Sequence, residues 1–304
     1  MLSTLEILLG EEQPDLVLVQ GDTTTALAGA LTAFHADVPV GHVEAGLRTG
    51  DVRAPFPEEM NRRLISRLAS YHFAATKENI GNLLREGILP SAIWHTGNPI
   101  VDALQWILRN QRPSEFVTEL IKAHAGKRLI VLTTHRRESF GKTMIDNLRA
   151  LARFVKANSD CVVIFPVHPN PSVRKATEEA LSGATGFEIV DSLNYADFIH
   201  LLSASWLIVS DSGGVQEEAP SLGKRLIVLR RNTERPEVVR SGIAKLIGDN
   251  PQLLEDTLKS ADSDIEWISA AGAKQELFGS GDAAQKITDV IQRVCRRQIT
   301  ACHR

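Results

Sequence analysis

Cysteines, long apolar runs and an excess of either charge sign are all scarce or absent in this 304-residue sequence. The three cysteines (Cys161, Cys295 and Cys302) are an odd number without metal-ligand spacing, which argues against a disulfide framework and favours a reducing, cytoplasmic compartment. The longest apolar runs, such as Leu129–Leu132 and Cys161–Phe165, are strand-sized and far short of the roughly 20 residues that span a bilayer. Nor does a basic segment with a cleavage site open the chain, so no signal peptide is expected.

The charges nearly balance, with 34 Lys and Arg residues against 37 Asp and Glu residues. This balance gives no reason to expect nucleic acid or an acidic membrane as a partner. Hydrophobic residues make up 43% of the chain and charged residues 23%, as is typical of soluble globular proteins. The length is sufficient for two domains, each with its own core.

Short β-rich runs alternate with helical patterns, which indicates parallel sheets covered by helices on both faces. In the first part of the chain, the predicted strands are Leu16–Gln20, Val38–Val43, Tyr71–Thr76 and Ile93–Gly97, and the predicted helices are Met1–Glu12, Thr24–Ala36, Glu58–Ala69 and Lys77–Gly87. After a polar stretch at Asn110–Lys127, six more strands are predicted at Arg128–Thr134, Cys161–Val167, Phe187–Asp191, Trp206–Asp211, Arg225–Arg230 and Ala244–Gly248. Two long helical patterns, Ile265–Gln275 and Ala283–Gln298, close the chain.

The predicted fold class is therefore α/β, with two Rossmann-like domains facing a cleft. We expect the first domain at residues 1–98, the second at 99–275, and a C-terminal helix at 276–304 that packs back toward the first domain. The first domain looks incomplete, because it opens on a helix rather than on a strand with a glycine loop. One continuous α/β sheet is the alternative, and the restart of the pattern after the polar stretch disfavours it.

A glycine turn in the second half is a candidate phosphate site. The strand at 206–211 ends in Ser212-Gly213-Gly214 and leads into a helix, where free N–H groups and the helix dipole can bind a phosphate. Glu218, inside that helix, is placed to accept hydrogen bonds from a ribose diol. The alternative is an ordinary strand–helix turn capped by the serine.

Basic residues follow the first strand of the second half. His135, Arg136 and Arg137 stand just past a buried strand, where ligands bind in α/β sheets, and they can neutralise a diphosphate. A solvated basic loop is the alternative. His168 also ends a strand and is a second candidate, although a rigid proline turn explains that segment almost as well.

Acidic residues follow strands in the first half. Asp22 and Glu44 stand at two strand ends, and Glu58 begins a helix on which Arg62 lies one turn later. With Arg48, these groups are expected to converge and to act as general acid and base. The alternatives are an N-cap role for Asp22 and a helix-dipole role for the glutamate.

Taken together, six segments resemble one family, the bacterial non-hydrolysing UDP-N-acetylglucosamine 2-epimerases. The matching segments are Gly21–Thr25, Gly41–Arg48, Pro57–Arg62, His135–Gly141, Asp211–Pro220 and Thr233–Glu237. Any one of them is weak evidence, but six in the family's order and spacing are highly specific.

The resemblance implies a two-domain fold shared with GT-B glycosyltransferases, with the nucleotide held mainly by the second domain. Carried over by match, the residues that contact UDP are His135, Ser212, Gly213, Gly214, Glu218 and Arg235, with Phe198 near the uracil. The basic loop adds Arg136 to this group. The positions that match catalytic ones are Asp22, Glu44, Glu58, Arg62 and His135.

The implied reaction interconverts UDP-N-acetylglucosamine and UDP-N-acetylmannosamine without a metal or redox cofactor. A base removes the C2 proton while UDP leaves C1, and UDP adds back to the resulting glycal as a proton arrives on the opposite face. The resemblance also implies a homodimer and a role in cell-surface polysaccharide biosynthesis.

One departure separates the chain from the usual family pattern. Members of the family begin with a strand and a Gly-Thr-Arg-Pro-Glu loop, and nothing in Met1–Asp15 matches them. About 70 residues are therefore expected to be missing, a number that would bring the first domain to a normal size. A chain without them is expected to fold poorly and to have little activity. Three alternatives therefore stay open: a hydrolysing epimerase, a GT-B glycosyltransferase, and an inactive UDP-sugar-binding fragment.

Overall fold

The chain divides into two compact units in its computed structural model, which describes residues 1–136, 139–272 and 276–302. Unit 1 consists of Met1–Ala103 and Phe278–Arg304, and unit 2 consists of Leu104–Leu277. The helix α5 (Pro99–Asn110) therefore starts in unit 1 and ends in unit 2. Across the described residues, no helix combines the length and the apolar character needed to cross a bilayer.

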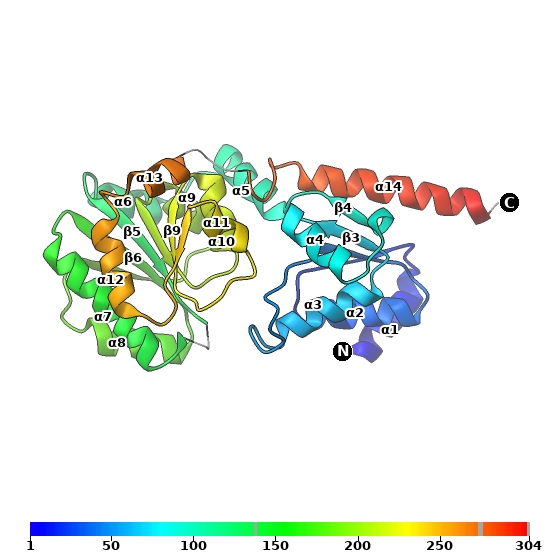
Figure 1. Cartoon of the computed structure of the whole chain (residues 1–304), viewed down its shortest axis with the longest axis horizontal. Helices are drawn as coiled ribbons and strands as arrows, with labels where there is room; N and C mark the ends of the chain where they lie inside the picture. Colours follow the sequence, from blue (N-terminus) through cyan, green and yellow to red (C-terminus); the bar gives the residue numbers. More distant parts are fainter. Residues whose placement is uncertain (137–138, 273–275, 303–304) are drawn as a thin grey trace. The chain divides into compact units, whose positions relative to one another are not determined.

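Unit 1 is built on a parallel sheet in the order β1-β2-β3-β4 (Figure 1). Its strands are β1 (Val17–Gln20), β2 (Val40–Ala45), β3 (Tyr71–Ala74) and β4 (Ile93–His95). Its helices are α1 (Leu2–Glu12), α2 (Thr24–His35), α3 (Glu58–Leu68), α4 (Lys77–Arg85), the short η1 (Pro90–Ala92) and α14 (Ala283–Cys302).

Helices cover both faces of the unit 1 sheet, because successive strand residues point to opposite faces and both faces carry apolar side chains. On one face, Val19 and Val40 pack with Ile65 of α3 and with the alanines of α2. On the other face, Val43 and Phe73 pack against Ile287 and Val290 of α14. Figure 1 shows α14 lying along this sheet beside β3 and β4. The last helix of the chain is thus part of the core of unit 1.

A remote carboxylate caps the first turn of α14. Asp102, on α5, accepts hydrogen bonds from the backbone N–H groups of Ala283 (3.1 Å) and Ala284 (2.9 Å). Nearby, Gly97 has φ +84°, and a Cβ there would lie 3.0 Å from the Phe278 carbonyl oxygen, so only glycine fits this chain crossing.

Replacing Asp102 by Ala is expected to lower the free energy of unfolding by about 1 kcal/mol, because it removes a charged cap from a helix N-terminus. Urea unfolding followed by circular dichroism measures the change. The matched control is Asp289→Ala, on the exposed face of the same helix, where a change within about 0.5 kcal/mol is expected. Equal losses in both variants would show that Asp102 is not an effective cap.

Unit 2 is built on a six-stranded parallel sheet in the order β10-β9-β8-β5-β6-β7. The strands are β5 (Arg128–Thr133), β6 (Cys161–Val167), β7 (Phe187–Asp191), β8 (Leu207–Ser210), β9 (Arg225–Val228) and β10 (Ala244–Leu246). The helices are α6 (Glu115–Ala123), α7 (Lys142–Ala157), α8 (Pro171–Leu181), α9 (Tyr195–Ala204), α10 (Val215–Leu222), α11 (Pro236–Arg240), α12 (Pro251–Ser260) and α13 (Ile265–Gly272).

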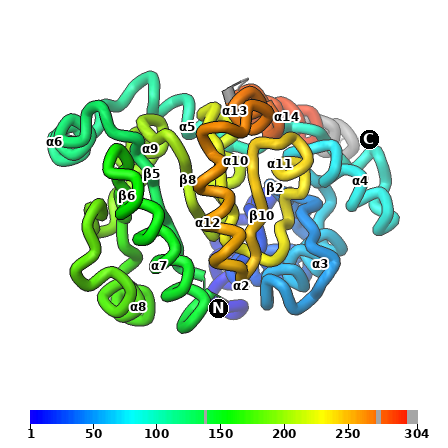
Figure 2. The backbone as a smooth tube through the Cα atoms, turned by 60° about the vertical axis from the view of Figure 1, so that its left-hand side comes forward, coloured from blue at the N-terminus to red at the C-terminus, as the bar shows by residue number. Residues whose placement is uncertain are grey.

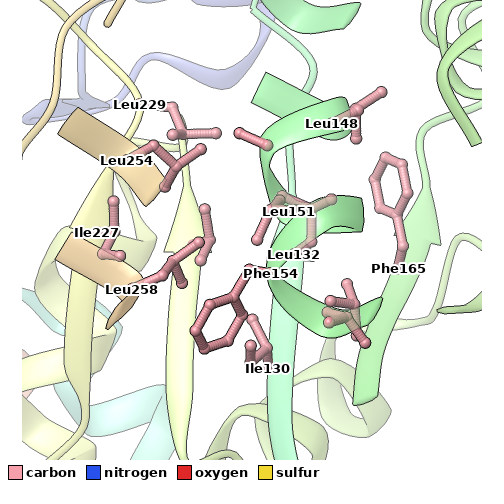
Figure 3. Close-up of a cluster of buried hydrophobic side chains, with 14 of the residues drawn as sticks. Ile130, Leu132, Leu148, Leu151, Phe154, Phe165, Ile227, Leu229, Leu254 and Leu258 are labelled. Atoms are coloured by element: carbon pink, nitrogen blue, oxygen red, sulfur yellow. The ribbon is translucent and has the colours of Figure 1, made fainter. Parts of the chain in front are cut away.

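The main core of unit 2 lies under α7 and α12, which run side by side over one face of the sheet (Figure 2). Figure 3 shows Leu151 and Phe154 of α7 and Leu258 of α12 packed among the strand residues Ile130 and Ile227. Fully apolar strands such as β6 are buried along their whole length, as a parallel sheet covered on both sides requires.

The predicted strands all occur, with ends that differ by at most two residues. The polar stretch at 110–127 is not all loop, however, because it contains α6, which begins at the Ser114 N-cap. Its residues Val117, Leu120 and Ile121 stand at the i, i+3, i+4 spacing of an amphipathic helix, so the helix could have been recognised in the sequence. The last three residues of the predicted helix at 265–275 lie outside the described residues.

Candidate active site

The strand order of unit 2 places a topological switch point between β5 and β8. The chain proceeds outward from β5 to β7 and then returns to the other side of β5 with β8. Thr133 and Ser210 are partners in the parallel register, so the residues that follow them leave the sheet side by side. Ligands of doubly wound sheets bind at this position. His135 and Arg136 follow one of these strands and Ser212–Gly214 follow the other.

Asp211 joins the two loops at the switch point. Its fully buried carboxylate accepts hydrogen bonds from Thr134 Oγ1 (2.7 Å) and from the backbone N–H groups of His135 (3.0 Å) and Arg136 (3.0 Å). In return, Arg136 Nε donates to the Asp211 carbonyl oxygen (3.1 Å). Asp211 therefore holds the basic loop in place, a role that the sequence analysis did not assign to it.

The His135 ring lies between a carboxylate and a second imidazole. Its Nδ1 is 3.5 Å from Asp211 Oδ1, and its ring stacks on His168 with 5.4 Å between centroids. Burial lowers the pKa of His135, the Asp211 carboxylate opposes this shift, and Arg136 and His168 add to it. His168 thus belongs to the same group of residues as His135.

Two arginines converge on the glycine turn. A Cβ at Gly213 would lie 3.0 Å from an Arg235 guanidinium nitrogen and 3.3 Å from one of Arg136, with Glu234 Oε1, the partner of Arg235, also at 3.3 Å. The helix α10 begins at the Gly214 N-cap without a side-chain cap, so the turn is not capped by Ser212. The turn therefore combines uncapped N–H groups with two positive charges, as an anion site requires.

Arg235 is held by buried carboxylates. Its Nε donates to Glu217, and one of its terminal nitrogens donates to Glu234 Oε1 at 2.7 Å. All three side chains are almost completely buried. Burial raises the pKa of Glu217, and the neighbouring guanidinium opposes that shift. This pairing fixes the plane of Arg235 beside Gly213.

Glu218, the next residue of α10, makes a hydrogen bond to a different helix. Its Oε1 accepts a hydrogen bond from the Tyr195 hydroxyl (2.9 Å) on α9. Its Oε2 is buried and has no hydrogen-bond partner among the residues that the structure describes. Burial raises the Glu218 pKa to about 7, although Tyr195 and Arg235 act in the opposite direction. Phe198 lies one helical turn after Tyr195 on the same side of α9.

In unit 1, Asp22 pairs with Arg62 from α3. Arg62 Nη2 lies 2.6 Å from Asp22 Oδ2, and its Nε donates to the same oxygen at 2.9 Å. The Arg62 side chain is 4% exposed, whereas that of Asp22 is 24% exposed. The carboxylate thus remains accessible while a buried cation fixes it. Thr23, not Asp22, caps α2 through its hydroxyl.

Glu44 adopts an unusual backbone conformation. It has φ +65°, which is uncommon for a non-glycine residue, and the β2–β3 register shifts at this point. A Cβ at Gly21 would lie 3.5 Å from Glu44 Oε2, so this carboxylate lies over the Gly21–Asp22 turn. The same turn is held by His42, whose Nε2 bonds the Gly21 carbonyl oxygen at 2.8 Å. Burial lowers the His42 pKa to about 3, so the ring is neutral and donates this bond.

The expectation that Arg48 lies together with the candidate catalytic acidic residues of unit 1 is wrong. Arg48 does not join Asp22 and Glu44, because its guanidinium pairs with Glu86 at the end of α4 and donates to Ser66. Glu58 lies half-buried on the first turn of α3, one turn before Arg62.

Its neighbour Glu59 is the buried member of the pair, which the sequence alone did not indicate. Glu59 accepts hydrogen bonds from the Thr49 backbone N–H (3.0 Å) and from Arg62 (3.3 Å). It therefore supports Arg62 from the side opposite Asp22. Of the expected basic loop, Arg137 lies outside the described residues.

These features define a class of protein. A doubly wound sheet in the Rossmann order, with a glycine turn and two arginines at its switch point, is typical of nucleotide-binding α/β proteins.

The comparisons with known proteins identify the family. The profile of the family described as UDP-N-acetylglucosamine 2-epimerase matches residues 1–292. The UDP-N-acetylglucosamine 2-epimerase of Escherichia coli strain K12 is 41% identical over 297 residues, which cover 96% of this chain and 79% of that protein.

Solved structures agree with this assignment. The S. aureus MnaA structure with UDP has a TM-score of 0.92 at 38% identity, covering 97% of this chain and 80% of that one. The UDP-GlcNAc 2-epimerase of Neisseria meningitidis, bound to UDP-GlcNAc, has a TM-score of 0.90 at 37% identity, covering 96% and 80%. The chain therefore belongs to the UDP-N-acetylglucosamine 2-epimerase family, a family of isomerases. The resemblance drawn from six motifs and the two-sheet α/β fold are both confirmed.

Proposed function

We propose that this protein interconverts UDP-N-acetylglucosamine and UDP-N-acetylmannosamine by eliminating and re-adding UDP, without hydrolysis. The observation that carries the proposal is the pair of arginines at the Gly213 turn, at the switch point of a Rossmann sheet. A leaving diphosphate needs such charge and such N–H donors, because negative charge develops on it as the C1–O bond breaks.

Unit 2 binds the nucleotide in this proposal. The Ser212–Gly214 turn, Arg136 and Arg235 contact the diphosphate. His135 lies beside the same loop and donates to the departing phosphate oxygen. Glu218 accepts the ribose hydroxyls, and Phe198 lies near the uracil.

Unit 1 carries out the proton transfers at C2 of the bound sugar. Asp22 and Glu44 lie at one turn, Arg62 fixes the Asp22 carboxylate, and Glu58 stands one turn away from Arg62. One carboxylate removes the C2 proton as UDP leaves C1, which gives an enzyme-held glycal. A proton then returns to the opposite face of C2 as UDP adds back to C1. Two acid–base groups on separate strands suit a reaction that needs a proton on each face.

Exchange of the C2 proton tests this function. The purified protein is incubated with UDP-N-acetylglucosamine in deuterated water, and the C2 proton is followed by NMR. Loss of the C2–H signal with the nucleotide sugar intact is the expected result, because every turnover passes through a species without a C2 proton. Free N-acetylmannosamine in place of UDP-N-acetylmannosamine would identify a hydrolysing epimerase.

The remaining alternatives give other outcomes in the same experiment. A glycosyltransferase would leave C2 unexchanged and would need an acceptor. A UDP-sugar-binding protein without activity would bind the nucleotide sugar and leave C2 unexchanged. Either result, obtained with a protein of the full length of the relatives, would overturn the proposal.

A further inference from the structure

Glu218 is a buried residue whose carboxyl group has a hydrogen-bond partner at one oxygen but, among the described residues, none at the other. Within the described part of the chain, Oε2 has no hydrogen-bond partner, although its residue is only 4% exposed. Buried polar atoms are rarely left without a partner, and such an exception is explained by an absent ligand or water. A group that donates hydrogen bonds is therefore expected to bind at Oε2.

The satisfied oxygen has an unusual partner. Tyr195 is the first residue of α9, and its hydroxyl reaches Glu218 Oε1 in α10, 23 residues later in the sequence. Tyr195 is one of only two tyrosines in the chain. The residue is 42% exposed, so the contact does not serve to bury an apolar side chain. What the contact does is fix the orientation of the Glu218 carboxyl group.

We propose that Tyr195 is a positioning residue, whose hydroxyl orients the Glu218 carboxylate so that Oε2 accepts hydrogen bonds from the vicinal diol of a bound ribose. This inference rests on the proposed function, because it takes the ligand to be a ribonucleotide. Phe198 lies one turn after Tyr195 on the same side of α9. The residue proposed to lie near the base is therefore on α9, and Glu218, which is proposed to bind the ribose, is on the neighbouring α10.

The tyrosine also affects the charge of Glu218. Burial raises the Glu218 pKa to about 7, and the hydrogen bond from Tyr195 opposes this rise because it stabilises the ionised carboxylate. Arg235 acts in the same direction, and Glu217 is the neighbouring carboxyl on α10. Without the tyrosine hydroxyl, the pKa of Glu218 rises further. A larger fraction of Glu218 is then protonated at neutral pH and accepts hydrogen bonds less well.

The test is the pH dependence of nucleotide-sugar binding in Tyr195→Phe. Calorimetry gives the Kd for UDP-N-acetylglucosamine between pH 5.5 and 8.5. This ligand is preferred to UDP, whose terminal phosphate titrates near pH 6 by analogy with other phosphate monoesters. At neutral pH, the variant is expected to bind about tenfold more weakly, the usual effect of losing a hydrogen bond to a charged group. As the pH is lowered, the affinity of the variant should begin to fall at a higher pH than that of the wild type, because its Glu218 becomes protonated earlier. His135 titrates in both proteins, so its contribution cancels in the comparison.

Two controls make the result specific. Tyr71→Phe, the same substitution on β3 of unit 1, is expected to leave both the Kd and its pH dependence unchanged. The 2′-deoxyribose analogue of the ligand should bind wild type and Tyr195→Phe with nearly equal affinity, because it lacks one hydroxyl of the diol.

Failure of the inference can be told apart from failure of the proposed function. If Tyr195→Phe binds UDP-N-acetylglucosamine like wild type, or loses the same affinity for ribose and deoxyribose ligands, the role of Tyr195 is refuted and the epimerase proposal stands. If wild type does not bind UDP-N-acetylglucosamine, the proposed function itself fails.

Discussion

Replacing Asp22 by Asn is expected to lower the rate of C2 exchange by about 100- to 10,000-fold, the usual contribution of a general acid or base. The asparagine oxygen can still accept the hydrogen bond from Arg62 Nε, so the local geometry is retained while the ionisable group is removed. UDP affinity is expected to change little, because the residues proposed to bind UDP belong to unit 2. The rate is measured by NMR in deuterated water and the affinity by calorimetry.

The matched control is Asp15→Asn. Asp15 is an exposed aspartate just before β1, whereas Asp22 comes just after the same strand. The control should exchange the C2 proton at the wild-type rate. An Asp22→Asn variant whose rate stays within about threefold of the control would contradict the catalytic assignment. A large loss of UDP affinity at an unchanged rate at saturating substrate would contradict it as well.

Much of the fold could be predicted because strands and helices have strong local patterns here. Runs such as Cys161–Val167 are apolar at every position, which a strand buried on both faces requires, and the structure gives β6 the same bounds. The helix α6 was missed because its stretch of the chain is polar as a whole, although Val117, Leu120 and Ile121 follow the i, i+3, i+4 spacing of an amphipathic helix.

The strand ends that carry the candidate residues could also be predicted, because the carboxyl ends of parallel strands meet at one edge of a sheet. Which of two adjacent polar residues takes the functional position could not be predicted. Asp22 and Thr23 are both good helix caps, and only the structure shows that Thr23 caps α2, which leaves Asp22 to pair with Arg62. Glu58 and Glu59 likewise occupy the same helical turn. Which of them is buried depends on the loop at Thr49, and no local rule describes that loop.

Contacts between distant segments could not be predicted either, because they depend on how helices and strands pack. Tyr195 and Glu218 come together only because α9 and α10 pack against each other. Asp211 was read as part of a motif, and its hydrogen bonds to Thr134, His135 and Arg136 depend on the pairing of β8 with β5. A sequence pattern predicts which strand ends carry polar residues, but not which of those residues hold the others in place.

Asp211→Asn should therefore have a large effect on both stability and turnover. The amide oxygen of asparagine can replace Oδ2, which accepts from Thr134, His135 and Arg136, but the negative charge is lost and the amide NH2 then faces the His135 N–H that Oδ1 also contacts. Hydrogen bonds to a charged group contribute about 1.5–3 kcal/mol and those to a neutral group less, so urea unfolding should show a loss of about 1–3 kcal/mol. Turnover is expected to fall by about 100-fold, because His135 and Arg136 would no longer be held in position at the Gly213 turn.

The His135 ring gives a separate measure of the same contact. The Asp211 carboxylate raises the pKa of His135 against the effect of burial, so removing its charge should lower that pKa further. Nitrogen-15 NMR of the imidazole across a pH series follows this shift. Asp191→Asn, at the exposed end of β7 in the same sheet, is the matched control and should behave like wild type in all three measurements. If Asp211→Asn has the stability, the turnover and the His135 titration of that control, then Asp211 does not organise the basic loop, and the positions of His135 and Arg136 depend on other contacts.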